Sequence, residues 1–245
     1  MRNPRAHDKP AFSSLSAILA FSALLPTLAQ GALPAETADG WTLRKETDNI
    51  RVYTIDQEDS SFKAFKAEAL MDTSLENLMA VMVNPKSCVE WVHNCTRSQA
   101  FGDGSFHDRY AYSVNDMPWP VADRDYVLRI RTHGEQTTGE VVMDLNAVPD
   151  RREEIDGLVR VDRSDTLYRF IPEGDKTHMV WIQHTDPNGA IPGWLVNSLL
   201  VDIPVRSMEQ LEQVTRQERY QGHTLVYDDE GKLVDVVSPS QSGDD

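Results

Sequence analysis

The chain has 245 residues, of which 40% are hydrophobic, and a formal net charge of −15 at pH 7. This length and hydrophobic content suffice for one large or two small folded domains, and they exclude a disordered chain. The acidic surface argues against nucleic acid as a partner and against unassisted adsorption to anionic bilayers, because both depend on basic patches.

The first 29 residues have the pattern of a secretory signal peptide. A positively charged start precedes an apolar run from about Leu15 to Leu28, and small residues follow it. The run is short for a membrane span of roughly 20 apolar residues and contains serines and a proline, so we expect cleavage and not anchoring. Residues 30–40 then form a small-residue linker. The pattern predicts export to a periplasmic or extracellular location.

The folded part begins at Trp41, and its first elements are strands and two short helices. Period-two alternation predicts strands over residues 50–55 and 61–71. The apolar spacing over residues 75–84 predicts a helix, preceded by polar N-cap residues and ended by a proline. A second helical turn is expected over residues 86–92.

Cys88 and Cys95 are the only cysteines in the chain. In an exported protein such a pair is most simply a disulfide. On one continuous helix their Cα atoms would lie about 10 Å apart, so the helix must end near His93 for the bond to form. The alternative is a metal site with these three side chains, but it lacks an evident fourth ligand. We therefore expect a disulfide, with neither a metal nor a cofactor.

From Thr96 onward the sequence predicts an antiparallel meander followed by one long helix. The expected strands cover residues 96–101, 105–114, 124–133, 139–148, 157–171 (with a bulge or bend) and 176–185. Short turn sequences separate them, so consecutive strands should be antiparallel neighbours. An amphipathic helix over residues 194–220, kinked at Pro204, must bury its apolar stripe against the meander. A small hairpin and a disordered acidic tail occupy residues 221–245.

Residues 110–133 join two of these strands through a rigid turn. Two prolines in residues 115–123 fix φ and remove backbone donors, so neither strand can continue through them. In the second strand Tyr126, Leu128 and Ile130 alternate with polar residues, among them two arginines. This strand therefore has an apolar face that can turn towards a core or a cavity while the arginines remain in water.

The order of elements and several local sequences resemble the START family of lipid-transfer domains within the helix-grip (SRPBCC/Bet v 1-like) superfamily. The residues that carry the resemblance are Trp91 with Cys95, the turn from Pro118 to Arg124-Asp125, Trp181, and DPNGAIPGWLVN from Asp186 to Asn197. It covers residues 41–220 as one domain. It implies an α+β helix-grip fold, with two short helices after an early strand and a curved antiparallel sheet wrapped on a long C-terminal helix.

The resemblance also implies a tunnel between sheet and helix for one lipid or other hydrophobic molecule. The residues expected to line it are Tyr112, Tyr126, Leu128, Ile130, Met143, Leu195, Leu199 and Ile203. Each of them is equally compatible with ordinary core packing. Sterol-carrying members place a carboxylate and an arginine inside the tunnel, and the matching positions here fall near Ala111 and Ile130. Both are apolar, which predicts a drier tunnel. Arg124 and Asp125 are expected to anchor the turn.

The leading functional hypothesis is an exported, non-enzymatic carrier of a lipid or other hydrophobic molecule that contacts membranes transiently. His133 is the best candidate for a general base, yet a solvated loop histidine explains it as well. Two alternatives stay open: a cyclase-like or hydrolase-like enzyme on the same scaffold, and a packed-core interaction module with an unknown protein partner. A tunnel of roughly 300 to 1,000 Å³ would favour the carrier or the enzyme, and a densely packed core would favour the module.

Overall fold

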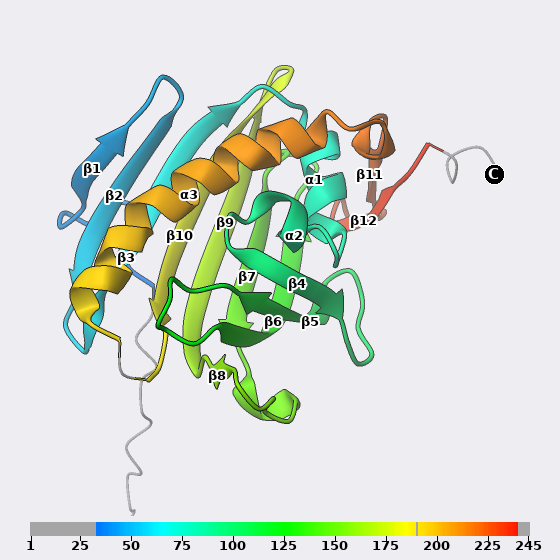
Figure 1. Cartoon of the computed structure of the whole chain (residues 1–245). Coiled ribbons are helices and arrows are strands. Elements are labelled where there is room, and N and C mark those ends of the chain that lie inside the picture. Colours follow the sequence, from blue (N-terminus) through cyan, green and yellow to red (C-terminus); the bar gives the residue numbers. More distant parts are fainter. Residues whose placement is uncertain (1–32, 190, 240–245) are drawn as a thin grey trace, which may run out of the picture. The chain divides into compact units, whose positions relative to one another are not determined.

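The computed structural model, shown in Figure 1, describes residues 33–189 and 191–239. Its main sheet has the strands β1 Thr42–Glu46, β2 Ile50–Gln57, β3 Ser60–Met71, β4 Cys95–Ala100, β5 Asp108–Asn115, β6 Arg124–Gly134, β7 Val141–Ala147, β8 Val159–Arg160, β9 Arg163–Glu173 and β10 Lys176–Asp186. The α-helices are α1 Leu75–Val83, α2 Cys88–Trp91 and α3 Gly193–Thr215. The described residues belong to one compact unit.

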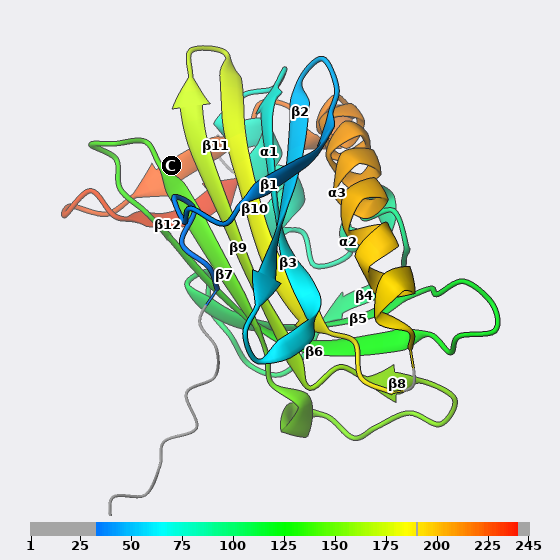
Figure 2. The same ribbon diagram turned by 90° about the vertical axis from the view of Figure 1, so that its left-hand side faces the viewer.

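The strands form one sheet in the order β1-β2-β3-β10-β9-β7-β6-β5-β4, and β8 pairs with β6 outside this path. From β4 to β10 it is the predicted meander, and the pairing of β10 with β3 joins the N-terminal strands to it. Figure 2 shows all three α-helices on one side of the curved sheet. This arrangement is the expected helix-grip fold.

Both predicted short helices are present after β3. The Ser74 hydroxyl accepts a hydrogen bond from the backbone N–H of Asn77, as an N-cap residue does. α2 ends at Trp91, and the chain then turns so that the Cα atoms of Cys88 and Cys95 lie 5.9 Å apart. The predicted disulfide joins them, and the alternative metal site is wrong.

The predicted strand over residues 157–171 is two strands. β8 pairs with β6 in parallel, and the antiparallel β9 begins only at Arg163. Between them the chain changes direction near Arg160, whose side chain forms a buried ion pair with Asp125 of β6. The bend that the sequence predicted is therefore a break between two elements.

The long helix α3 lies across β3 and β2 and ends at Thr215, five residues before the predicted end. Gln217 already has an extended backbone, and a short 3₁₀ turn, Glu218–Tyr220, follows. α3 runs through Pro204 without interruption. Its buried residues Val205, Met208 and Leu211 share the main hydrophobic core with the sheet and α1. The second half of α3 therefore packs on the sheet as part of the core.

A separate hairpin of β11 Thr224–Tyr227 and β12 Leu233–Val237 follows, as predicted. Its Leu233 is fully buried against the main core. The predicted signal peptide, the start of the linker and the tail from residue 240 lie outside the described residues. Within the part of the chain that is described, no helix is long and apolar enough to cross a membrane.

Candidate functional site

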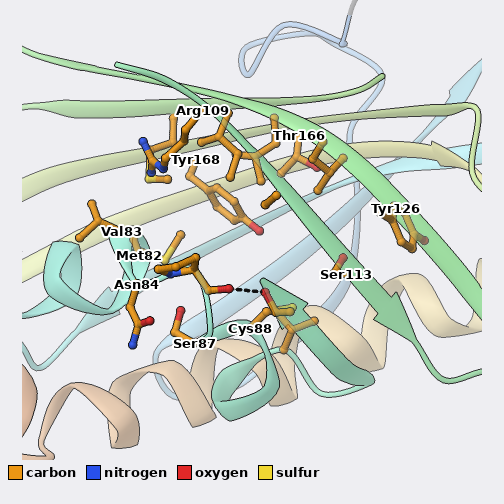
Figure 3. A pocket seen from close by; sticks show the side chains of 18 of the residues that line it. Met82, Val83, Asn84, Ser87, Cys88, Arg109, Ser113, Tyr126, Thr166 and Tyr168 are labelled. Carbon is orange, nitrogen blue, oxygen red and sulfur yellow. Dashed lines mark hydrogen bonds between the residues drawn. The ribbon is translucent and has the colours of Figure 1, made fainter. Parts of the chain in front are cut away.

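A cavity of about 160 Å³ lies between the sheet and the segment that runs from the end of α1 through α2 (Figure 3). Its lining residues are Met82, Val83, Asn84, Pro85, Ser87, Cys88, Trp91, Val92, Ser98, Ala100, Arg109, Tyr110, Ala111, Ser113, Asn115, Tyr126, Leu128, Ile130, Met143, Leu145, Ser164, Thr166, Tyr168, Trp181 and Gln183. The volume is about ten times what one water needs and is below the range of roughly 300 to 1,000 Å³ usual for ligand pockets.

Strand register brings the lining side chains of the sheet together. Ile130 of β6 is paired with Leu145 of β7, and Leu145 with Thr166 of β9. Because side chains two residues apart share a face, each strand contributes alternate residues to the cavity. The cavity floor is thus the face of the sheet that bears Leu128, Ile130 and Met143.

An aromatic cluster forms the boundary below α2. Trp91 of α2 contacts Tyr168 and Trp181 edge-on, with ring centroids 6.1 and 5.9 Å apart. All three side chains are at most 5% exposed. Trp91 and Trp181, which carried the family resemblance, therefore attach α2 to the sheet and close one side of the cavity.

Two tyrosine hydroxyls face this apolar space. Burial raises the pKa of Tyr126 to about 12, and it also raises the pKa of Tyr168. Neither hydroxyl makes a hydrogen bond to another described residue, and Figure 3 shows the Tyr168 hydroxyl pointing into the cavity. Both phenols stay protonated at neutral pH, so they offer hydrogen bonds to a bound molecule.

Arg109 of β5 is the one charged side chain among the described residues that line the cavity. It lies opposite Ile130 in the β5–β6 pair. Its Nη1 donates to the backbone carbonyl of Phe106 and to the Thr132 hydroxyl, at 2.5 and 2.9 Å. The prediction of a drier tunnel is wrong in this respect. The sequence already indicated that Arg109 could face the cavity, because it precedes Ala111 by two residues and so lies on the same face of the strand.

Four of the predicted tunnel residues, Tyr126, Leu128, Ile130 and Met143, line the cavity. Tyr112 does not, because it points to the opposite face of β5. There it is fully buried with Val114 and Val127, and the Arg152 guanidinium lies 3.9 Å from its ring centroid. The predicted alternation along β5 is correct. However, the face that lines the cavity is the one that bears Ala111 and Ser113, and not the one that bears Tyr112.

The three residues expected from the long helix, Leu195, Leu199 and Ile203, also do not line the cavity. They are partly exposed, while the adjacent Val196 and Pro204 are buried. Apolar residues occupy both the predicted positions and the adjacent ones, so the sequence did not determine which side of the helix faces the sheet. The cover of the cavity is the segment from Met82 to Val92, and not α3.

Arg124 and Asp125 form a structural anchor, as predicted. The Arg124 guanidinium donates to the carbonyls of Pro187 and Asn188, at 3.0 and 2.8 Å, and so fixes the β6 start to the loop after β10. Asp125 accepts two hydrogen bonds from Arg160, at 3.0 and 2.9 Å, on the face away from the cavity.

The candidate catalytic residues are not gathered in the cavity. His133 is exposed near the end of β6. The described lining contains no histidine and no carboxylate, and no group of metal-binding side chains occurs among the described residues. What the lining offers chemically is an apolar wall, a few hydroxyl and amide groups, and one guanidinium.

Comparison with known proteins places this fold in a family. The family model described as START domain matches residues 29–214. The protein PA1579 of Pseudomonas aeruginosa is 30% identical over 71% of this chain and 86% of its own length. The phosphatidylcholine transfer protein of Bos taurus is 23% identical over 67% of this chain and 78% of its own length.

Solved structures agree with this assignment. A STAR-related lipid transfer protein fragment from Xanthomonas axonopodis is similar with a TM-score of 0.68 and 27% identity, over 73% of this chain and all of that one. Human STARD10 shares the fold with a TM-score of 0.65 and 18% identity, over 74% of each chain. The chain belongs to the START domain family, whose members typically bind lipids or other hydrophobic ligands.

Proposed function

We propose that this protein is an exported carrier that holds one hydrophobic molecule, a lipid or part of one, in the cavity beneath α2. The observation that carries the proposal is the lining. Leu128, Ile130, Met143 and Leu145 surround an unfilled space inside a domain whose core is otherwise closely packed. An apolar space with a few convergent polar groups is the usual form of a small-molecule site.

The cavity volume limits what this form of the protein holds. About 160 Å³ is small for a lipid with two acyl chains, so such a ligand would need the cover to move. The segment from Met82 to Val92 is the part that would open, and the disulfide between Cys88 and Cys95 ties it to the start of β4. A ligand with a single chain requires less opening.

The disulfide supports export. Disulfides persist in oxidising compartments and are rare in the cytosol. Denaturing alkylation of the mature protein should find no free thiol, and N-terminal sequencing should place its start near residue 30. Two labelled cysteines, or an intact N-terminus in the cytosolic fraction, would contradict the proposed location.

Two exposed tryptophans support transient contact with membranes. Trp119, in the β5–β6 loop, is 92% exposed, and Trp194, in the first turn of α3, is 73% exposed. The segments that carry them pack together through Met117 and Val196, and Figure 2 shows both segments at the same end of the sheet. Tryptophan is favoured at membrane interfaces. Since the net charge is −15, we expect zwitterionic bilayers to be preferred over anionic ones.

Native mass spectrometry of the purified mature protein is the direct test. We expect a complex with one bound molecule, which organic extraction releases for identification. A protein that carries nothing, and that also takes up no fluorescent lipid, would contradict the carrier. The enzyme and the packed-core module would then be the hypotheses to pursue, starting with a search for turnover.

A further inference from the structure

Arg109 is half-buried, and no carboxylate in the described structure pairs with its charge. Its Nη2 is inaccessible to solvent and has no hydrogen-bond partner. Burial lowers the pKa of Arg109, and no nearby carboxylate counteracts this effect. The adjacent Asp108 points to the other side of the strand and binds Arg129, with 2.8 Å between Asp108 Oδ1 and Arg129 Nε. Arg109 therefore keeps its charge without a counter-ion.

Such an arrangement is costly unless a partner is supplied. Buried polar groups are nearly always hydrogen-bonded, and buried charges are paired. The hydrogen bonds of Arg109, to a carbonyl and to the Thr132 hydroxyl, involve Nη1 and hold the guanidinium in place. The guanidinium also lies over the Phe106 ring, 5.9 Å from its centroid. Nη2 is left with both of its N–H groups available. A guanidinium held in this way can receive an anionic oxygen once the lining moves and uncovers Nη2.

The position of Arg109 also defines where an apolar tail would lie. Arg109 is paired with Ile130, and Ser113 with Tyr126, so these two pairs are four residues apart along β5 and β6. At about 3.4 Å per residue this distance is about 14 Å. Leu128 lies between them on the cavity face, and Figure 3 shows Arg109 and Tyr126 at opposite ends of the lining. The cavity thus has its one charged lining residue at one end, and Ile130 and Leu128 form an apolar floor between that end and Tyr126.

We infer that the natural ligand is a single-chain amphiphile with an anionic head, whose carboxylate or phosphate oxygen binds Nη2 of Arg109 and whose tail lies along Ile130 and Leu128 towards Tyr126. This inference rests on the proposed carrier function and makes it more specific. A single chain also suits the small volume of the cavity. No other described lining residue carries a charge with which the head could pair.

The test compares an acid with its uncharged ester in the exported protein after bound molecules have been removed on hydrophobic resin. The probes are cis-parinaric acid and its methyl ester, followed by fluorescence. A charged hydrogen bond of about 1.5 to 3 kcal/mol predicts that the acid binds about 10- to 100-fold more tightly than the ester. In Arg109→Met this preference should fall to less than about threefold, with ester binding retained.

Arg129→Met is the matched control. It removes an arginine from the same hairpin but from the opposite face, so the preference for the acid should remain. Arg109→Lys should keep part of the preference, since it retains the charge and loses the forked geometry. If Arg109→Met does not fold, the comparison of the lysine variant with wild type still tests the inference, because unchanged selectivity would overturn it.

The remaining outcomes separate the two proposals. If the ester binds and the acid is not preferred, Arg109 is not the anchor and the carrier function stands. If neither probe binds, the proposed function fails together with the inference.

Competition by lysophosphatidic acid but not by lauric acid would identify the head as a phosphate, and the reverse would identify it as a carboxylate. Competition by inorganic phosphate alone, without any acyl chain effect, would overturn the proposed position of the tail.

Discussion

Two arginines, Arg160 and Arg109, show how differently the two faces of the β5–β6 pair are built. On the outer face, Arg160 makes five hydrogen bonds: two to Asp125 and three to the backbone carbonyls of Pro149, Arg152 and Glu153. On the cavity face, Arg109 makes two, both through one nitrogen. Arg160 completes the fold by itself, whereas Arg109 lacks a partner for its second nitrogen.

This difference suggests that the outer face contributes mainly to stability and the cavity face mainly to ligand binding. The outer face is closed by its own residues, among them the fully buried Tyr112 and Val127, under the segment that contains Arg152 and Ile155. The cavity face has unfilled volume beside the unpartnered Nη2 of Arg109, whereas Tyr112 and Val127 of the outer face do not line that volume, although the buried Tyr112 hydroxyl there also lacks a hydrogen-bond partner within the described structure. A domain tolerates such a face because the rest of its core is closely packed. Substitutions on the outer face should therefore change stability, and those on the cavity face should change ligand binding.

The largest effect is expected from Arg160→Met. The substitution leaves Asp125 buried without its partner, and breaking a buried ion pair on one side costs about 3 to 5 kcal/mol. Urea unfolding of the variant should show this loss in the free energy of unfolding. Arg129→Met, which removes an exposed ion pair, should change the free energy of unfolding far less, because solvent screens such pairs. Equal losses in the two variants would contradict the contrast between a buried and an exposed pair.

Removal of the disulfide should have the next largest effect, and it should change both the free energy of unfolding and the rate of ligand uptake. By the chain-entropy estimate, closing so short a loop contributes about 2 to 3 kcal/mol, which the double variant Cys88→Ser/Cys95→Ser would lose. Because this bond ties the cover of the cavity to β4, the variant should also take up cis-parinaric acid faster. Adding a reductant should reproduce both effects in the wild type and change nothing in the variant. Uptake at the wild-type rate would show that the cover opens elsewhere.

Much of this fold followed from local sequence signals. Alternation located β2, β3 and the meander, and the polar residues before Leu75 located the start of α1. The disulfide was predicted because Cys88 and Cys95 are the only cysteines of a chain that is expected to be exported. These features depend on neighbours in the sequence, and so they can be read without the tertiary structure. The end of α3 and the break after β8 were missed, because the contacts of Arg160 and the 3₁₀ turn at Tyr220 decide them.

The cavity could be predicted only in part, for a related reason. Alternation states which residues share a face and does not state which face is covered, so Tyr112 was assigned to the wrong side. The rotation of α3 depends on packing against β3, since Leu195 and Val196 are both apolar. Arg109 was overlooked because an arginine on a strand is usually solvated. Only the tertiary structure shows that no counter-ion lies beside its guanidinium in the described residues.

Ile130 provides the sharpest test of which face binds the ligand. Ile130→Arg places a second guanidinium in the cavity beside Arg109, which reduces the apolar volume and adds a like charge. Binding of the uncharged methyl ester should fall by more than about tenfold, which corresponds to 1.4 kcal/mol. Arg129→Ala, one residue away and on the other face, should leave it within about twofold. The reverse order, measured by the same fluorescence titration, would show that the outer face binds the ligand.

The smallest effect concerns His184, which is 2% exposed on β10 and has no partner at Nε2 within the described structure. Burial, helped by the nearby Arg163 charge, lowers its pKa, and a backbone hydrogen bond involving Phe62 and the charges of Asp59 and Asp165 oppose this only in part. Since the folded state holds His184 neutral, only the unfolded chain takes up the proton as the pH falls below about 6.5.

The free energy of unfolding should therefore decrease between pH 7 and pH 5, with a contribution from His184 of at most about 1.4 kcal/mol per pH unit. His184→Gln cannot titrate, so its stability should depend less on pH than that of the wild type over this interval. Urea unfolding at several pH values measures both proteins. Parallel profiles for wild type and His184→Gln would mean that His184 is protonated without cost in the folded state, in spite of its burial.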